Sequence, residues 1–273
     1  MTGQDKTPWW VVDPSTPSVA RIYDYYLGGK DNFASDRQAA EKIISLAPNI
    51  RDIARINRAF LGRVVRTLAE SGIRQFLDIG TGLPTQENVH QVAQRVAPES
   101  RVVYVDNDPI VLVHARALLD ENRLTRVVSA DLRDPRSILD HREVRAHLDF
   151  DQPLAVLLLA VLHFITDDAE CHRIVGTLRD ALPGGSHLVI SHGTLGDLSE
   201  EEMRQAREVY TTTPAGGATP RSDAQIRSFF TGFELLEPGL VPLHEWRPDP
   251  WAPEPDPAVK DGIGAVGAVG RLP

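Results

Sequence analysis

The first part of the chain carries the apolar spacing of helices. Between residues 18 and 27, apolar side chains recur at i, i+3, i+4 and i+7, and the pair Gly28 and Gly29 ends the pattern. The face that this spacing predicts consists of Val19, Ile22, Tyr23 and Tyr26. Two further helices are predicted over 35–48 and 50–70. The segment 1–17, with its prolines and two adjacent tryptophans, is typical of an extended arm.

After Gly72 the pattern changes to short apolar runs that alternate with helical spacing. The runs that predict strands are 75–79, 101–105, 126–130, 154–159 and 187–191, with two later candidates at 233–237 and 264–270. Aspartate followed by proline, at 108–109 and 134–135, provides an N-cap and a first helical residue for the helices between strands. Further helices are expected near 199–210 and 222–231. This alternation predicts a parallel sheet covered by helices on both faces.

Composition narrows the classes of function. Hydrophobic residues make up 42% of the chain and charged residues 25%, which is typical of a globular protein with a core. The net charge of −9 disfavours binding of nucleic acid through its phosphates. A single cysteine, Cys171, excludes a disulfide framework or a multi-cysteine zinc site, and its apolar neighbours predict a small buried side chain. We find neither a signal peptide nor an apolar run long enough to cross a membrane, and expect a cytoplasmic protein without a metal site.

The sharpest local signal is the segment 76–85, where a predicted strand runs into a glycine turn. Gly80 and Gly82 would let a ligand approach the backbone, and a helix expected from near Thr85 would present free N–H groups. A dinucleotide fingerprint requires a third glycine where this chain has Thr85. Asp78, two residues before the turn, would repel a pyrophosphate. The segment therefore favours a ligand with a cationic group.

Acidic residues also follow the next two predicted strands. Asp106 could accept hydrogen bonds from both hydroxyls of a ribose, because a carboxylate has two oxygens. Asp131 could accept from the exocyclic amine of an adenine, with the backbone of Leu132 beside the ring. Asp108 is better explained as a helix N-cap. Since the carboxyl ends of parallel strands share one edge of the sheet, these residues predict a single nucleoside site there.

The glycine turn, Asp106 and Asp131 resemble the pattern of class I S-adenosylmethionine-dependent methyltransferases. More narrowly, the segments 17–43 and 55–66 resemble the actinobacterial "S-adenosyl methyltransferase" family, once classified as a domain of unknown function. This resemblance covers nearly the whole chain and implies a Rossmann-like, seven-stranded, mostly parallel sheet. It also implies that 233–237 and 264–270 pair at the far edge, one of them antiparallel. We expect an N-terminal arm and helical lid over 1–72 and a methyltransferase core over 73–273, together forming one structural domain.

The resemblance implies S-adenosylmethionine as the cofactor. Asp78 and the glycine turn would lie along its methionine end, where Asp78 could attract the amino group. The predicted cofactor-binding residues are Asp78, Gly80, Thr81, Gly82, Asp106, Asn107, Asp131, Leu132, Ala160, Tyr23 and Tyr26. The methyl acceptor is expected to be a small molecule, and the resemblance does not identify it.

Catalysis by methyl transfer needs a base only where the acceptor carries a proton to be removed. His163, after the fourth predicted strand, is the titratable candidate, although a histidine between Leu162 and Phe164 is also typical of a packed side chain. Asn57 is either a satisfied interior amide or a residue that points into the site. Two alternatives to the enzyme stay open: a catalytically inactive S-adenosylmethionine- or nucleoside-binding protein, and an NAD-dependent oxidoreductase.

The N-terminal helices allow two interpretations. Their aromatic face must pack against something, so they form either a structural brace or a lid over the carboxyl edge of the sheet. In the second case Tyr23 or Tyr26 would lie against the cofactor or the acceptor.

Overall fold

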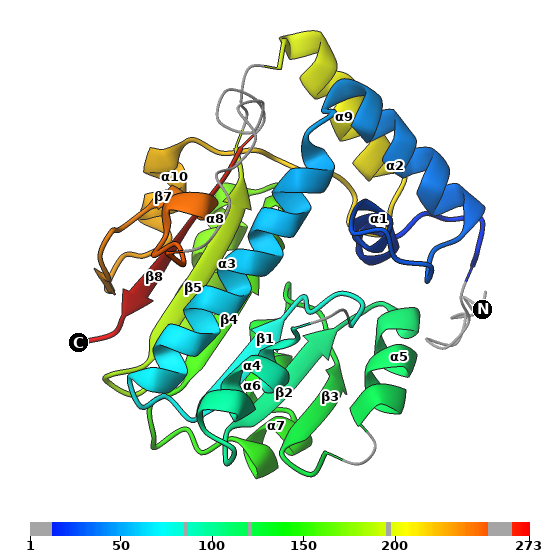
Figure 1. Cartoon of the computed structure of the whole chain (residues 1–273). Coiled ribbons are helices and arrows are strands. Elements are labelled where there is room, and N and C mark those ends of the chain that lie inside the picture. Colours follow the sequence, from blue (N-terminus) through cyan, green and yellow to red (C-terminus); the bar gives the residue numbers. More distant parts are fainter. Residues whose placement is uncertain (1–12, 85–86, 120–121, 195–197, 251–263) are drawn as a thin grey trace, which may run out of the picture.

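The structure, a computed structural model, describes residues 13–84, 87–119, 122–194, 198–250 and 264–273. Its centre is a mostly parallel sheet in the order β3-β2-β1-β4-β5-β8-β6, with β7 also paired to β8 (Figure 1). The strands are β1 (Gln75–Ile79), β2 (Arg101–Asp106), β3 (Thr125–Ser129), β4 (Ala155–Leu159), β5 (His187–Gly193), β6 (Glu234–Leu235), β7 (Val241–Pro242) and β8 (Ala265–Arg271). The parallel sheet that the sequence predicts is thereby confirmed.

The last strands form the far edge of the sheet as expected. β8 pairs antiparallel with β5, and β6 pairs antiparallel with β8. Within the described ranges the sheet has eight strands rather than seven, because β7 also pairs with β8. β7 is only two residues long and contains a proline, so neither alternation nor residue preference signals it.

Helices cover both faces of the sheet. Alternate residues of each strand point to opposite faces, so that Leu77 and Val103 belong to one apolar cluster and Phe76 and Val102 to the other. The helix α3 (Ile50–Glu70) lies on the second face. The other helices of the core are α4 (Val89–Val96), α5 (Pro109–Leu119), α6 (Pro135–Leu139), α7 (Arg142–His147), α8 (Asp168–Arg179) and α10 (Asp223–Ser228).

Three helices form a separate layer that we call the cap. It consists of α1 (Val19–Tyr26), α2 (Ala34–Leu46) and α9 (Glu200–Thr211), which Figure 1 shows packed together beside the sheet. A third apolar cluster joins them, with Ile22, Ile43 and Val209 at its centre. Of the first 72 residues, α1 and α2 thus belong to the cap whereas α3 packs on the sheet, and the division of the chain at residue 72 stays a prediction.

One predicted boundary is wrong. The helix after the glycine turn begins at Val89, not near Thr85, and Thr85 itself lies outside the described residues. Asn88 is its N-cap, where the backbone N–H of Asn88 donates to Gln91 Oε1 at 2.9 Å. The strong capping pair therefore places the start later than the glycines alone suggest.

Cys171 is buried, which confirms the prediction of a small buried side chain. Burial raises the pKa of its thiol to about 11. No helix in the described part of the chain combines the length and the apolar character that crossing a membrane requires.

Candidate functional site

A cavity of about 630 Å³ lies at the carboxyl ends of the strands, beneath the cap. Every residue predicted to bind the cofactor lines this cavity, and so does His163. The structure thus brings together side chains from the sheet edge with Tyr23 and Tyr26 of α1. Among the described residues, no group of three or more His, Cys, Asp or Glu side chains is arranged to hold a metal ion.

The first and last residues of the glycine turn, Gly80 and Gly82, have backbone conformations that favour glycine. Gly80 and Gly82 have φ of +76° and +66°, in the left-handed region. A Cβ on Gly80 would lie 2.6 Å from Val161 Cγ2, whereas one on Gly82 would meet nothing within 4 Å. Gly80 is therefore fixed by packing against Val161, and Gly82 leaves its backbone open to a ligand in the cavity.

Asp106 connects the glycine turn to the second strand. Its Oδ2 accepts from the Gly82 N–H and its Oδ1 from the Asp108 N–H, both at 2.9 Å. Burial raises the pKa of Asp106 to about 6 despite these hydrogen bonds. Each carboxylate oxygen keeps a lone pair beyond its backbone donor, which is the capacity that two ribose hydroxyls require.

Asp131 is bound to its neighbours rather than free. Arg133 donates to it from Nη2 at 2.8 Å and from Nε at 3.0 Å, and Asn107 donates from Nδ2 at 3.2 Å. Partial burial raises the pKa of Asp131, but the hydrogen bonds from Arg133 outweigh this effect and the pKa is lowered. The Asp131–Arg133 ion pair is exposed, so a ligand could rearrange it at little cost.

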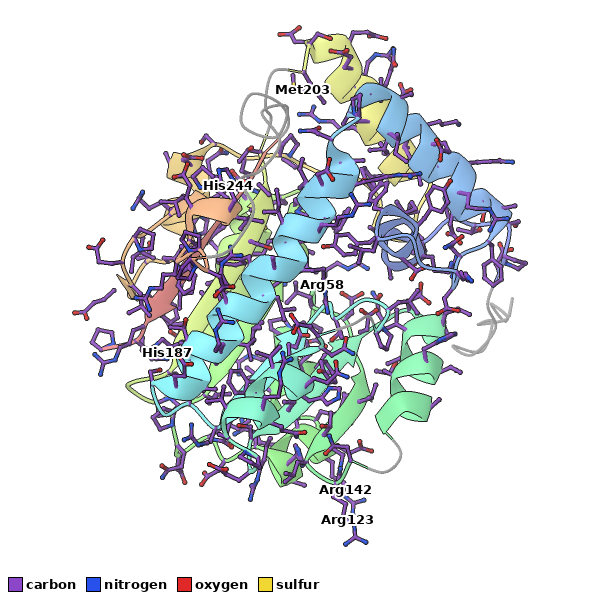
Figure 2. All side chains as sticks on the ribbon, viewed as in Figure 1. Arg58, Arg123, Arg142, His187, Met203 and His244 are labelled. Carbon is purple, nitrogen blue, oxygen red and sulfur yellow. The ribbon has the colours of Figure 1, made fainter. Side chains whose placement is uncertain are left out.

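Asp78 and Arg58 place an ionisable carboxyl group and a positive charge at the same end of the cavity. Asp78 is only 4% exposed, and burial raises its pKa to about 7 although the positive charge of Arg58 opposes the shift. Arg58 lies on α3 (Figure 2), where its Nη2 donates to the Glu87 carbonyl at 3.3 Å and its buried Nε has no partner among the described residues. Arg58 is not among the residues predicted from the sequence, although its position next to Asn57 on the predicted helix is a usable signal.

A chain of buried and partly buried hydrogen bonds links the cap to the end of β4. The Ala160 N–H donates to Ser191 Oγ at 2.8 Å, and Ser191 Oγ donates to Asn57 Oδ1 at 2.7 Å. Asn57 Nδ2 then donates to Tyr23 Oη at 3.0 Å, and Tyr23 Oη donates to the Ala54 carbonyl at 3.0 Å. Asn57 is therefore a satisfied interior amide that also lines the cavity. Ala160 has a φ of +51°, a strained conformation for a residue with a side chain.

Two histidines lie near each other at the cavity, with ring centroids 5.4 Å apart. His192 Nε2 faces Arg221 Nη1 at 3.2 Å, and because a guanidinium only donates, this nitrogen must accept. His192 Nδ1 then carries the proton and donates to the Gly193 carbonyl at 2.8 Å, and burial lowers the pKa of His192 to about 4. His163 differs: burial lowers its pKa well below the usual value, and its Nδ1 has no partner among the described residues.

The cap closes the cavity with aromatic side chains. Tyr26 Oη lies 3.3 Å from Tyr210 Oη, and the ring of Phe164 lies 5.5 Å from that of Tyr210. Burial raises the pKa of both tyrosines, so both are neutral phenols. The sequence predicts α9 as a helix but does not show that Tyr210 faces the cavity, since only tertiary packing determines this.

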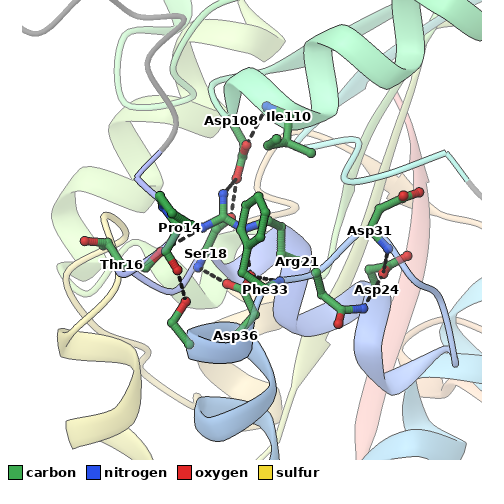
Figure 3. A network of polar contacts seen from close by, with 12 residues as sticks. Pro14, Thr16, Ser18, Arg21, Asp24, Asp31, Phe33, Asp36, Asp108 and Ile110 are labelled. Carbon is green, nitrogen blue, oxygen red and sulfur yellow. Dashed lines mark hydrogen bonds and ion pairs between the residues drawn. The ribbon is translucent and has the colours of Figure 1, made fainter.

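A buried network attaches α1 and α2 to the sheet edge (Figure 3). Arg21 Nε lies 2.9 Å from Asp36 Oδ2, and Arg21 Nη1 lies 3.5 Å from Asp108 Oδ2. Ser18 donates its backbone N–H to Asp36 at 2.8 Å and its hydroxyl to Asp108. Asp108 also accepts from the Ile110 N–H at 2.8 Å, which confirms it as the N-cap of α5 and gives it a second role.

Comparison with known proteins agrees with this geometry. A family model described as S-adenosyl methyltransferase matches residues 5–273. A structure of a candidate methyltransferase from Thermobifida fusca is 41% identical, covers 99% of both chains and has a TM-score of 0.86. A DUF574-family protein from Streptomyces avermitilis is 42% identical over 96% of this chain and 99% of its own, with a TM-score of 0.88.

A more distant structure shows the fold alone. The N-methyltransferase NodS from Bradyrhizobium japonicum, in complex with S-adenosyl-L-homocysteine, is 13% identical and has a TM-score of 0.50. The alignment covers 81% of this chain and 88% of NodS. A search among functionally curated proteins finds no match.

Proposed function

Because the chain belongs to the S-adenosyl methyltransferase family, with S-adenosylmethionine as its methyl donor, we propose that it methylates a small-molecule acceptor inside the cavity beneath the cap. Bound there, the cofactor supplies an electrophilic methyl group on a sulfonium sulfur. The alternative of an NAD-dependent oxidoreductase has no support from the family.

The observation that carries this proposal is that Asp78 and Arg58 line the same cavity, close enough for the positive charge of Arg58 to oppose the rise in the pKa of Asp78 that burial causes. The methionine half of the cofactor has an ammonium group and a carboxylate on one carbon atom. Asp78 offers a buried carboxyl group whose pKa burial has raised, so that a nearby ammonium group would favour its ionised form. Arg58 offers a buried N–H without a partner among the described residues. A zwitterion with both charges on one carbon atom would satisfy both groups at once, whereas adenosine carries neither charge.

The other predicted residues would hold the nucleoside. Asp106 would accept from the ribose hydroxyls, with Asn107 beside it. Asp131 would accept from the adenine amine after its contacts with Arg133 rearrange, and Leu132 would pack on the ring. We assign His163 the role of proton acceptor from a hydroxyl on the acceptor.

We further propose that the cap acts as a lid. The cap covers the cavity with Tyr23 and Tyr26, and excluding water would strengthen every electrostatic contact within it. The network of Ser18, Arg21, Asp36 and Asp108 would hold the lid in its closed position.

Calorimetric titration with S-adenosylhomocysteine and with adenosine tests the assignment. The variant Arg58→Met should weaken binding of S-adenosylhomocysteine about tenfold to a hundredfold and leave adenosine unchanged, since adenosine has no carboxylate. Arg55→Met is the matched control, because Arg55 lies on the same helix and is exposed. Equal losses for both ligands would contradict the zwitterion site. Transfer of a labelled methyl group to a metabolite extract then separates an enzyme from an inactive binding protein.

A further inference from the structure

The cavity has two halves with different chemistry. The half at the sheet edge carries Asp78, Asp106, Asp131 and Arg58. The half beneath the cap is apolar, and its side chains include Ile43, Leu46, Ile50, Ile53, Met203 and Ala206. Figure 2 shows Met203 on α9, far along the chain from the N-terminal residues that share this half. The nucleoside site leaves the apolar half for a second molecule.

Charges are almost absent from the described lining of the apolar half. The cap and the segment before it contribute Asp13, Arg21 and Arg207. Arg21 is buried and already paired with Asp36 and Asp108, whereas Asp13 and Arg207 are exposed. An ionised group on an occupant would therefore lose its hydration without gaining a buried partner, which is strongly unfavourable.

Aromatic rings border the apolar half where it meets the sheet edge. Phe164 contacts Tyr210 with ring centroids 5.5 Å apart, and it also lies 4.3 Å from the ring of His163. Rings in such offset or edge-on arrangements form a surface on which another flat ring packs favourably. Tyr26 adds a further buried aromatic side chain.

His163 supplies the remaining polar contact at this border. The neighbouring His192 has both ring nitrogens engaged, by the Gly193 carbonyl and by Arg221. His163 lines the cavity with no hydrogen bond from its imidazole to the described residues. A neutral imidazole offers one donor and one acceptor, so it matches a hydroxyl group.

Resting on the proposed function, we propose that the methyl acceptor is a neutral, largely apolar aromatic compound that carries a hydroxyl group. Its ring lies in the apolar half, and its hydroxyl group donates to the imidazole of His163. In the reaction, the acceptor oxygen forms a bond to the methyl carbon as the carbon–sulfur bond breaks and leaves its electron pair on sulfur. The hydroxyl proton passes to the imidazole, which becomes an imidazolium.

Binding of model compounds to protein saturated with S-adenosylhomocysteine tests this inference without requiring turnover. The probes are 2-naphthol, which is neutral near pH 7, and 2-naphthoate, which has the same rings but is ionised. We expect 2-naphthol to bind at least about tenfold more tightly than 2-naphthoate. Equal binding of the two compounds, or tighter binding of 2-naphthoate, would overturn the proposal.

Variants locate the bound ring. Ala206→Phe fills the apolar half and should weaken 2-naphthol binding at least about tenfold, while Gln205→Phe, at an exposed position of the same helix, should not change it. If Ala206→Phe fails to melt like the parent protein, Met203→Trp makes the same test at a partly exposed position. A folded variant that fills the cavity yet binds 2-naphthol normally would place the ring elsewhere and refute the inference.

His163→Phe keeps a ring but removes the hydrogen bond. It should weaken 2-naphthol binding about tenfold and leave naphthalene binding unchanged, and equal effects on both compounds would exclude His163 as the contact. The titration of S-adenosylhomocysteine in the same preparations keeps the two proposals distinguishable. If that ligand binds and 2-naphthol does not, the acceptor class is wrong and the proposed function stands. If S-adenosylhomocysteine does not bind, the proposed function fails and the acceptor proposal fails with it, and 2-naphthol titrated into the ligand-free protein then tests only whether the apolar half binds a neutral aromatic compound.

Discussion

Replacing Asp78 by asparagine should stabilise the ligand-free protein, and by more as the pH rises. Burial raises the pKa of Asp78 from 3.8 to about 7. The ionised carboxylate is therefore about 4 kcal/mol less stable in the fold than in water. Between about pH 4 and pH 7 the folded protein holds a proton that the unfolded chain has lost, so the stability of the parent protein falls as the pH rises through this window. Asparagine cannot ionise and does not share this loss.

Urea unfolding at two pH values measures the effect. The stability of Asp78→Asn minus that of the parent protein should grow by about 2–3 kcal/mol between about pH 5 and pH 8. Asp223→Asn is the control, because Asp223 is exposed and its replacement should change the unfolding free energy by the same small amount at both pH values. A difference that stays constant or shrinks with rising pH would refute the argument that Asp78 is ionised at a cost.

The same substitution should weaken the binding of the cofactor product. The ammonium group of S-adenosylhomocysteine favours the ionised form of Asp78, so binding near pH 6.5 should release a large fraction of a proton. Calorimetry in two buffers with different ionisation enthalpies measures this release. The release should vanish in Asp78→Asn and be smaller with adenosine, which lacks the ammonium group. Equal release by both ligands would show that another group titrates.

Three further substitutions test the rest of the site. Asp106→Ala should weaken S-adenosylmethionine binding by about 1.5–3 kcal/mol in a calorimetric titration, and unchanged affinity in a folded variant would remove Asp106 from the site. Tyr23→Phe leaves the buried amide of Asn57 without its acceptor and should lower the unfolding free energy by about 1–3 kcal/mol. An unchanged unfolding free energy would show that this hydrogen bond does not stabilise the fold. Arg21→Met leaves Asp36 buried without a counterion and should lower the unfolding free energy by about 3–5 kcal/mol. Adding Asp36→Asn should restore this stability. A loss of stability that persists in the double variant would show that the packing of Arg21, not its charge, is responsible.

The sequence predicts the sheet well because strands buried on both faces give continuous apolar runs. An acidic residue lies at or near the carboxyl end of each of the first three strands. It also predicts that Asp78, Asp106 and Asp131 line one cavity, since the carboxyl ends of parallel strands must meet at one edge of the sheet. Arg58 and Tyr210 were missed because each lies on a helix whose orientation depends on tertiary packing. β7 was not predicted because a strand of two residues is too short to show an alternation of apolar and polar side chains.

The packing of α1 against α9 limits which variants can distinguish a lid from a structural brace. Ile22 and Tyr26 of α1 share an apolar cluster with Val209 of α9, which follows the fifth strand. Deleting residues 1–33 would uncover that face of α9 as well as opening the cavity, so weaker cofactor binding could follow from local unfolding alone. Single substitutions within the buried network leave the apolar cluster intact and change only the attachment of α1 to the sheet edge. A lid therefore predicts that Arg21→Met with Asp36→Asn restores stability without fully restoring cofactor affinity, whereas a structural brace predicts that both recover together.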